Sequence, residues 1–433
     1  MTTPIIIGRN EDDKKKFGDK GTILIGKHYV TIGQTTALSN PVYLDVNTPH
    51  IVLVSGKRGS GKSYSLGSIA EEMTKLPEDV ANNLAVLMFD TMGIFWTMKY
   101  PNTQQEKQLQ QWQIKPEGMH INLYVPEGHF NDYKNKGIPV DQPFSLKTAE
   151  LTPNDWCSVF NLTMTSEEGI LIQRAMNDLP KDYSISNLIE RVQRDAKAPP
   201  KTKDTVESLF DNANHWGLFH AQGTSIKDLI KKGETTILDL SPYTESAGNW
   251  SIKALVIGII TRKLLHQRIA SRKTEEISNI EAEGKYFSEE EQKEEPLIWL
   301  LIDELHEFLP KKGSTPATDA LVQVLREGRQ PGISLIGATQ QPGEIHQDVL
   351  TQTDIVISHR LTSKLDLAAL NSMMQSYHYQ SLQRFMNDLP KLRGAALVLD
   401  DNSERIYPMQ IKPKRSWHGG SSPTAIKTSD IKN

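Results

Sequence analysis

Apolar residues cluster along this chain in short runs that alternate with helical patterns. Predominantly apolar runs of strand length lie at 51–55, 84–90, 236–240, 297–302, 333–339, 354–359 and 395–400. Runs with so few polar positions are typical of strands buried on both faces of a parallel sheet. After the first run, Leu66, Ile69, Ala70 and Met73 follow the spacing i, i+3, i+4, i+7 of a helix that buries one face. We therefore expect an α/β fold around a mostly parallel central sheet.

Two stretches depart from this alternation and suggest how the chain is divided. Residues 1–45 hold short β-type pieces between polar turns, and we expect a short N-terminal β region that resembles a truncated barrel. Residues 101–235 show several helix patterns that end at prolines, and they predict a mainly helical insertion. The core would then consist of residues 46–100 and 236–411, followed by an extended C-terminal tail at 412–433.

Two charge-dense segments are expected to be surface loops. The first is Asp12–Lys20, which we predict to be a solvated loop between strands. The second is Lys273–Glu295, which is rich in Glu and poor in apolar residues. A segment of this composition cannot bury enough apolar surface to order itself, so we predict a mobile loop.

Composition excludes several classes of protein. The 433 residues are 37% hydrophobic and 24% charged, with a formal net charge of -4, which suits a globular protein better than a polycation that coats nucleic acid. The single cysteine, Cys157, cannot form an intrachain disulfide or a cysteine-rich metal cluster, so we expect a reducing cytoplasm. No apolar run approaches the ~20 residues of a membrane helix. The charged start does not resemble a secretory signal.

The strongest motif follows the strand predicted at 51–55. Its residues are Gly56, Lys57, Arg58, Gly59, Ser60, Gly61, Lys62 and Ser63, which fit the pattern G-x-x-x-x-G-K-[ST] in full. Glycines let the backbone N–H groups of such a loop point at phosphate oxygens, and the following helix adds its positive end. We expect this loop, together with Tyr64, to bind ATP. Lys62 would reach the β- and γ-phosphates, and the Ser63 hydroxyl would be a ligand of Mg²⁺.

A second motif places Asp303 and Glu304 at the end of the apolar run 297–302. A strand that delivers a carboxylate at its C-terminal end matches the acid on the Mg²⁺ side of P-loop ATPases. We expect Asp303 to hold the metal and Glu304 to polarise the attacking water. The acid pair favours hydrolysis over phosphoryl transfer to a substrate, whereas two acids that only cap a helix would give the same pattern.

Three further polar residues follow predicted strands. Gln340 comes directly after 333–339, where an amide can contact the γ-phosphate or its water and report the nucleotide state. Asp90 and Asp239 end two other strands. Ligands of parallel sheets lie at the carboxyl ends of the strands, so these acids would either line the nucleotide site or only form turns.

Several basic residues have both a general and a specific interpretation. Arg326 and Arg329 lie three residues apart at the end of a predicted helix, where cations are favourable in any protein. The specific interpretation is an arginine finger that enters a neighbouring subunit's ATP site, with no preference between the two. Arg360 is a weaker candidate for this role. Lys311-Lys312 and Lys412–Arg415 could contact nucleic-acid phosphates, although short basic clusters are usually solvated surface.

The order of these segments resembles the HerA/FtsK branch of P-loop ATPases, and in particular the HerA-like proteins. The segments are GKRGSGKS, VLMFDTMG, ILDLS, LLIDELHEFLP, LREGRQPGISLIGATQQP and LRGAALVLD. The resemblance implies a RecA-like core and a homo-hexameric ring that moves along double-stranded DNA, often with a nuclease partner such as NurA. The residues that carry over, in the roles given above, are Lys62, Ser63, Asp303, Glu304, Gln340, Arg326 and Arg329.

The chain departs from this family at three points. Arg58 stands where members often have Thr, and Ile94 stands where they often have an acid. The N-terminal β region is shorter than the usual full barrel. Because the barrel is a plausible docking surface, its shortness weakens the expectation of a nuclease partner.

These observations predict an ATP-hydrolysing hexameric motor that translocates or unwinds double-stranded DNA, in DNA-end processing or defence. The alternative is an ATP-driven protein assembly or secretion motor with the same core and a different cargo. The acid pair disfavours a small-molecule kinase, and the intact motif set disfavours a scaffold that binds nucleotide without hydrolysis.

Overall fold

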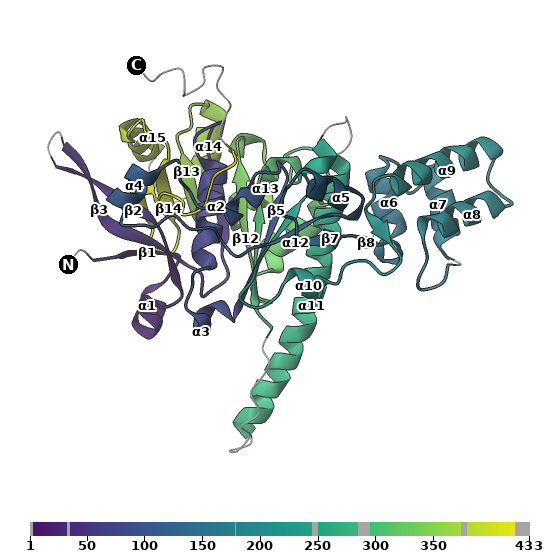
Figure 1. Ribbon diagram of the computed structural model, residues 1–433, viewed down its shortest axis with the longest axis horizontal. Helices are drawn as coiled ribbons and strands as arrows, with labels where there is room; N and C mark the ends of the chain where they lie inside the picture. Colours follow the sequence, from purple (N-terminus) through teal and green to yellow (C-terminus); the bar gives the residue numbers. More distant parts are fainter. Residues whose placement is uncertain are drawn as a thin grey trace.

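A computed structural model describes residues 3–32, 35–177, 179–244, 250–284, 295–373 and 379–420. Within these ranges, thirteen strands form one sheet in the order β1-β3-β2-β15-β14-β13-β4-β12-β11-β5-β10-β6-β7 (Figure 1). Their bounds are Ile5–Ile7 (β1), Thr22–Ile32 (β2), Thr35–Asp45 (β3), Ile51–Ser55 (β4), Leu84–Asp90 (β5), Asn122–Pro126 (β6), Gln142–Phe144 (β7), Thr235–Asp239 (β10), Leu297–Ile302 (β11), Ile333–Thr339 (β12), Ile355–His359 (β13), Ala395–Asp400 (β14) and Arg405–Ile411 (β15). Two short strands, β8 (Leu146–Lys147) and β9 (Phe219–His220), pair separately.

The strands from β13 to β7 run parallel, which confirms the expected α/β fold with a mostly parallel sheet. Strands β14, β15, β2 and β3 continue the sheet with antiparallel pairing. The N-terminal β region therefore extends the central sheet through β15, and it does not close as a separate barrel. Strand β15 was not expected, because its alternating sequence RIYPMQI contains a proline.

Helices cover both faces of the sheet. Their bounds are Glu11–Phe17 (α1), Lys62–Met73 (α2), Glu78–Ala81 (α3), Glu106–Gln111 (α4), Glu127–Asn135 (α5), Pro153–Val159 (α6), Glu167–Asn177 (α7), Ile185–Arg194 (α8), Pro200–Asn214 (α9), Ile226–Leu229 (α10), Trp250–Gly284 (α11), Thr318–Glu327 (α12), Gln347–Gln352 (α13), Lys364–Ser372 (α14) and Tyr379–Asp388 (α15). Single 3-10 turns lie at Phe95–Lys99 (η1), Thr148–Glu150 (η2), Ser241–Thr244 (η3), Leu305–Glu307 (η4) and Pro342–Glu344 (η5).

Alternate side chains of the central strands pack into two separate hydrophobic cores, one on each face of the sheet. Val54 and Leu301 pack on one face with the apolar side of α2. Leu53 and Leu300 pack on the other face with α11 and α12. Successive strand side chains point to opposite faces, so a strand covered on both sides must be apolar at nearly every position. Burial of these strands on both faces explains the continuous apolar runs in the sequence.

The helical part of the molecule comprises fewer residues than the insertion expected at 101–235. Strands β6 and β7 lie within that range but belong to the central sheet. Helices α6–α9 form a projection at one end of the molecule, coloured teal in Figure 1. It is built on Trp156, which stacks on Phe160 at 5.5 Å between ring centroids and meets Phe210 edge-on at 5.1 Å.

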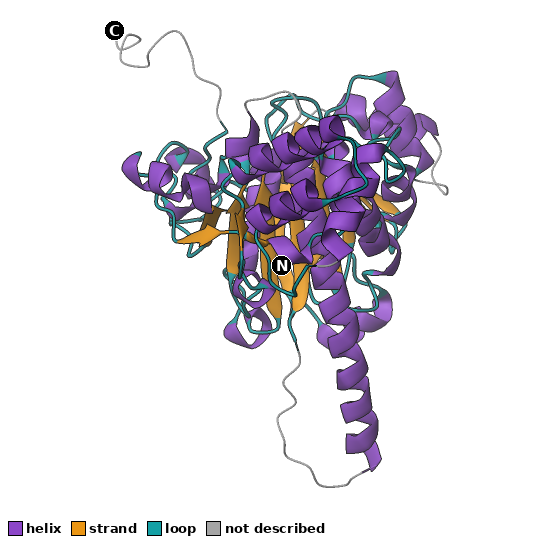
Figure 2. Cartoon of the chain, turned by 90° about the vertical axis from the view of Figure 1, so that its right-hand side faces the viewer, coloured by secondary structure: helices purple, strands orange, loops and turns teal. Residues whose placement is uncertain are grey.

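Both predicted charge-dense loops need correction. Helix α1 occupies most of Asp12–Lys20, with Asn10 as its N-cap, acids in its first turn and lysines in its last. Helix α11 continues to Gly284 and projects beyond the sheet (Figure 2), so the first half of the predicted loop at Lys273–Glu295 is helical. Residues 285–294 lie outside the described part of the chain. Arg272 bridges to Glu275 and Glu276 one turn ahead, and such pairs support an exposed helix.

Candidate active site at the carboxyl-terminal edge of the sheet

The phosphate-binding motif forms the tight turn between β4 and α2. Gly56, Gly59 and Gly61 all have positive φ angles, of 154°, 75° and 116°. A Cβ on Gly56 would lie 2.5 Å from Ser60 Oγ and 2.6 Å from His359 Cβ, so only glycine fits there. The turn directs the first N–H groups of α2, which have no partner within the helix, toward one point beyond the end of β4.

The acidic motif lies opposite this loop. Strand β11 is separated from β4 by β12 alone, and it ends at Ile302. The Ser63 hydroxyl donates a hydrogen bond of 2.6 Å to Asp303 Oδ2. Asp303 is buried, and that burial raises the pKa of its carboxyl group. The structure therefore brings together the two residues expected to share the metal, although 240 positions separate them in the sequence.

Glu304 follows Asp303 in an uncommon backbone conformation. Its φ and ψ of 51° and 46° lie in the left-handed region, and its N–H donates to Asp303 Oδ1 at 2.9 Å. Gln340 Nε2 donates to Glu304 Oε1, so the predicted base and the predicted sensor are in direct contact. Glu304 Oε2 is buried without a hydrogen-bond partner among the described residues, and His306 Nδ1 lies 3.6 Å from it. A buried acceptor without a hydrogen bond is costly unless a ligand or water supplies a donor.

Lys62 begins α2 between the loop and the acids. Burial lowers the pKa of its ammonium group, and the nearby Glu304 and Asp303 partly oppose this effect. Its nearest protein acceptor is Lys57 O, at 3.5 Å from Nζ. Ser60 Oγ is also buried without a hydrogen-bond partner. A triphosphate would supply hydrogen-bond partners for Lys62 Nζ and Ser60 Oγ. The oxygen atoms of Ser63 and Asp303 suit Mg²⁺, which prefers oxygen ligands.

Comparison with known proteins agrees with this geometry. A family model described as "Helicase HerA, central domain" matches residues 30–264, which is more than half of the chain. The chain belongs to the HerA family. It is accordingly an ATPase of the P-loop class with a RecA-like core.

Individual HerA proteins are distant relatives. The HerA of Sulfurisphaera tokodaii, a DNA double-strand break repair helicase, is 22% identical over 393 residues, which are 89% of this chain and 67% of that protein. The HerA of Pyrococcus furiosus is 24% identical over 165 residues, which are 37% of this chain and 28% of that protein. The chain thus spans at most about two thirds of the length of these relatives.

The fold is also that of a solved structure outside the HerA group. VirB4 of Thermoanaerobacter pseudethanolicus superposes with a TM-score of 0.54 at 12% identity, over 94% of this chain and 98% of that chain. In the described part of the chain, no helix has the length and apolarity needed to cross a membrane, and this includes the 35-residue α11.

His359 supports the phosphate loop of this HerA-family chain and was not expected from the sequence. It ends β13, is buried, and has its Nδ1 at 3.1 Å from Ala395 O. A carbonyl only accepts, so Nδ1 carries the proton and Nε2 accepts from Ser65 Oγ at 2.9 Å. Burial lowers the pKa of His359 to about 4, which keeps the ring neutral. The ring therefore joins the first turn of α2 to the start of β14.

Tyr64 requires a correction. Its side chain does not line the phosphate loop, because the hydroxyl donates to Gln105 Oε1 at 2.7 Å and accepts from Lys414 N at 2.6 Å. Its ring meets His418 edge-on, with 5.2 Å between centroids. Only the backbone N–H of Tyr64 remains available to a phosphate.

The C-terminal segment also differs from expectation. Residues 412–420, expected to be part of an extended tail, pack along α2 and the neighbouring loops. Lys412 Nζ lies 2.6 Å from Glu71 Oε1 and 2.9 Å from Glu72 Oε1. Lys414 is 1% exposed, and burial lowers its pKa to about 8. These two lysines are therefore not available to nucleic acid, whereas residues 421–433 lie outside the described part of the chain.

Asp90 and Asp239 end β5 and β10, beside β11. Asp90 accepts from the N–H groups of Met92, Gly93 and Phe95 at 2.8–3.1 Å. Asp239 accepts from Ser241 N at 2.9 Å and from a tyrosine hydroxyl at 3.1 Å. Burial and the nearby Asp239 raise the pKa of Asp90 to about 8. Both acids accept hydrogen bonds from the turns that follow them, and Asp239 also accepts one from Tyr133 on α5, which favours the turn-forming interpretation.

Arg326 and Arg329 are far from the phosphate loop of their own chain. Arg326 lies in the last turn of α12 and Arg329 just after it, shortly before β12 begins at the amino-terminal ends of the parallel strands. The seven residues of β12 separate the two edges by roughly 20 Å. Arg326 is exposed and pairs with Asp348 at 2.8 Å, and Arg329 is also exposed. Arg360 instead lies at the nucleotide edge, where its carbonyl accepts from Lys57 N at 3.5 Å.

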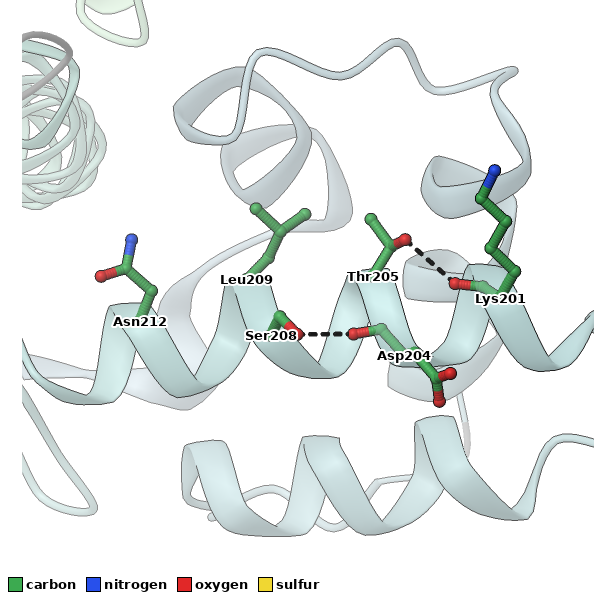
Figure 3. Close-up of a pocket in the computed structure, with 6 residues that line it drawn as sticks. All are labelled: Lys201, Asp204, Thr205, Ser208, Leu209 and Asn212. Atoms are coloured by element: carbon green, nitrogen blue, oxygen red, sulfur yellow. Dashed lines mark hydrogen bonds between the residues drawn. The ribbon is translucent and has the colours of Figure 1, made fainter.

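A separate hollow lies on α9, in the helical projection (Figure 3). It is lined by Lys201, Asp204, Thr205, Ser208, Leu209 and Asn212. The Thr205 and Ser208 hydroxyls donate to the backbone of their own helix, at 2.9 and 2.8 Å. The hollow is one open helix face without converging polar groups, so it is not the candidate active site.

Proposed function

We propose that this chain is the ATPase subunit of a homo-hexameric ring motor that translocates or unwinds double-stranded DNA. The observation that carries the proposal is the cluster in which Ser63 contacts Asp303 while Gln340 contacts Glu304. These residues come from the start of α2 and from the positions that directly follow β11 and β12, and the two acids lie near Lys62. Membership of the HerA family supports the same chemistry.

In the proposed reaction, ATP lies with its β- and γ-phosphates against Lys62 and the N–H groups of residues 56–63. Ser63 and Asp303 would hold Mg²⁺, which neutralises phosphate charge when bound. Glu304 accepts a proton from the attacking water through Oε2, which has no hydrogen bond among the described residues. Gln340 fixes the Glu304 side chain through Oε1 and contacts the same water, so it responds to the loss of the γ-phosphate.

The ring assembly is proposed from the position of the arginines. Arg326 and Arg329 cannot reach the phosphate loop of their own chain across the sheet, but exposed cations at the opposite edge can reach a neighbour. A head-to-tail contact of this kind closes into a ring when the rotation between subunits permits. The guanidinium would stabilise charge on the transferred phosphoryl group.

Double-stranded DNA is proposed as the cargo because the HerA relatives are named DNA double-strand break repair helicases. A NurA-like nuclease that docks on the β1–β3 region is proposed with it, for DNA-end processing or defence. The alternative, a protein assembly or secretion motor, would use the same active site. The two differ in whether nucleic acid changes the rate of ATP hydrolysis.

The test is ATP hydrolysis by the full chain with and without duplex DNA over a range of salt concentrations, with the Glu304→Gln variant as the background control. Protein–phosphate contacts weaken as salt rises, so DNA stimulation should fall steeply between about 50 and 200 mM salt. Solution mass measured on the same samples should give six subunits. Hydrolysis that duplex DNA never changes would favour the protein motor.

A further inference from the structure

The loop before β14 is in contact with the phosphate loop. A Cβ built on Gly61 would lie 3.7 Å from Gly394 N and 3.9 Å from Gly394 Cα. Strand β13 runs parallel to β4, and β14 runs antiparallel to β13. The first residue of β14 therefore lies on the same side of the sheet as the carboxyl-terminal end of β4. Residues 392–394 therefore border the nucleotide site, although 331 or more positions separate them from Gly61 in the sequence.

The acids of the site determine which end of a nucleotide faces this loop. Asp303 and Glu304 lie on the β11 side of β4, beyond β12. The γ-phosphate must face those acids and Lys62. The ribose and base then leave the phosphate loop on its other side, toward β13 and β14.

We propose that Leu392 and Arg393 form the base and ribose subsite of the nucleoside triphosphate. This inference rests on the proposed ATPase site. Leu392 is 65% exposed and offers an apolar surface for a flat aromatic base. Arg393 is exposed beside it, and a guanidinium can stack on a base or donate to ribose hydroxyls.

The loop is held in place before any ligand binds. Gln410 Nε2 donates to Arg393 O at 2.9 Å, and Ile411 N donates to Gly394 O at 2.9 Å. Gln410 is fixed in turn by the Tyr29 hydroxyl, which donates to its Oε1 at 2.6 Å. A Cβ on Gly394 would lie 2.6 Å from Gln410 Nε2, and its φ is +83°, so this tether requires glycine. A subsite held in this way loses little freedom when it binds a ligand.

The test compares ATP with inorganic tripolyphosphate, which has the phosphates but no base or ribose. Affinities for both, each with Mg²⁺, are measured for the full chain and for the double variant Leu392→Ala, Arg393→Ala. We expect ATP to bind roughly tenfold or more weakly to the variant and tripolyphosphate to change less than about twofold. Ile280→Ala is the matched control, because Ile280 is 71% exposed on the distant end of α11.

The outcomes separate this inference from the function on which it rests. Unchanged ATP affinity in the double variant would overturn the subsite and leave the ATPase proposal intact. Equal weakening of ATP and tripolyphosphate would also overturn it, because the loop would then act on the phosphates. Failure of the unsubstituted chain to bind either ligand would overturn both proposals.

Discussion

At the scale of single residues, Glu304 is the side chain whose surroundings are hardest to explain without a ligand. It adopts a left-handed conformation that few non-glycine residues take, and its Oε2 is buried without a hydrogen bond, with His306 Nδ1 at 3.6 Å. Backbone strain and unsatisfied polar atoms concentrate at functional sites, because the surrounding structure must stabilise them. We infer that the fold positions this carboxylate for a water molecule next to the γ-phosphate.

Replacing Glu304 by Gln should separate binding from hydrolysis. The amide keeps the size of the side chain but cannot accept a proton, so turnover should fall by roughly 10²–10⁴ while ATP is still bound. Turnover and retained ATP are measured on the same sample. Glu190, an exposed acid on α8 of the helical projection, provides the control, since Glu190→Gln should hydrolyse at nearly the original rate. A Glu304→Gln protein that turned over normally would remove the assigned base.

Lys62 carries the positive charge that faces the phosphates. The substitution Lys62→Ala should weaken ATP binding roughly a hundredfold or more, because a charge-assisted hydrogen bond and the neutralisation of phosphate are both lost. Nucleotide affinity is measured directly by calorimetry. Lys203→Ala, on the helical projection, should bind ATP as before. If the unsubstituted chain, Lys62→Ala and Lys203→Ala all bound ATP equally well, the placement of the triphosphate against Lys62 would be contradicted.

At the scale of elements, helix α2 is fixed at both ends by segments distant in sequence. His359 joins its first turn to β13 and β14. Near its last turn, fully buried Glu71 accepts from Lys412 Nζ at 2.6 Å and from Ser416 Oγ at 2.9 Å. Because α2 begins at the phosphate loop, these contacts determine where that loop lies.

The buried ion pair gives a stability prediction. Lys412→Met leaves the Glu71 carboxylate buried without its cation, which should lower the free energy of unfolding by ~3–5 kcal/mol. Urea denaturation followed by circular dichroism measures the change. Lys391→Met, at an exposed position, should change it by less than ~0.5 kcal/mol. A similarly small loss in Lys412→Met would show that the C-terminal segment does not stabilise α2.

His50 directly precedes β4, at the end of that strand away from the phosphate loop, and it should make stability depend on pH. His50 Nδ1 lies 2.6 Å from Asp354 Oδ2, and its Nε2 lies 3.3 Å from Asp45 Oδ2, while Arg9 pairs with the same Asp45. Burial alone lowers the pKa of His50, but the hydrogen bonds and attraction of the two carboxylates outweigh it and raise the pKa to about 9. The folded protein therefore holds this proton more tightly than the unfolded chain.

The sign of the pH effect follows from that raised pKa. Protonated His50 stabilises the fold fully below its ordinary pKa of 6.5, and this stabilisation is lost as the pH rises through about 9. The stability difference between the original protein and His50→Asn should therefore shrink from pH 6.5 to pH 9. Urea denaturation of both proteins across this range measures it. A difference that stays constant or grows would mean that His50 is not charged in the folded state.

The sequence predicted the elements whose burial is uniform. Leu84–Asp90 and Ile333–Thr339 coincide with β5 and β12, because strands covered on both faces are apolar throughout. Helix α1 was missed because it buries none of its residues and is supported only by its cap and by local ion pairs such as Glu11–Lys14. A search for apolar periodicity cannot find such a helix.

The site was predictable where a local motif carries it. Gly56–Ser63 and the acids at 303 and 304 are recognisable from their own spacing. The supports of the site are different, because His359 meets Ser65 across 294 positions and Lys412 meets Glu71 across 341. A single sequence does not reveal which distant residues pair, so these supports emerge only from the fold.

At the scale of the whole molecule, the two halves of the proposed catalytic machinery lie at opposite ends of the parallel strands. The phosphate loop, Asp303 and Glu304 are at the carboxyl-terminal ends, and Arg326 and Arg329 are at the amino-terminal ends. A single subunit therefore cannot complete its own site if an arginine is needed. Two adjacent copies, arranged head to tail, supply both halves at one boundary.

Mixing two inactive variants tests this claim most directly. Lys62→Ala should bind ATP too weakly to hydrolyse it but retains its arginines. The double variant Arg326→Ala, Arg329→Ala retains its phosphate loop but lacks the arginines. Each alone should be nearly inactive, and equal amounts assembled together should hydrolyse ATP at about a quarter of the original rate, the share of boundaries that pair two intact halves. No recovery in the mixture, or full activity of the arginine double variant alone, would contradict a shared site.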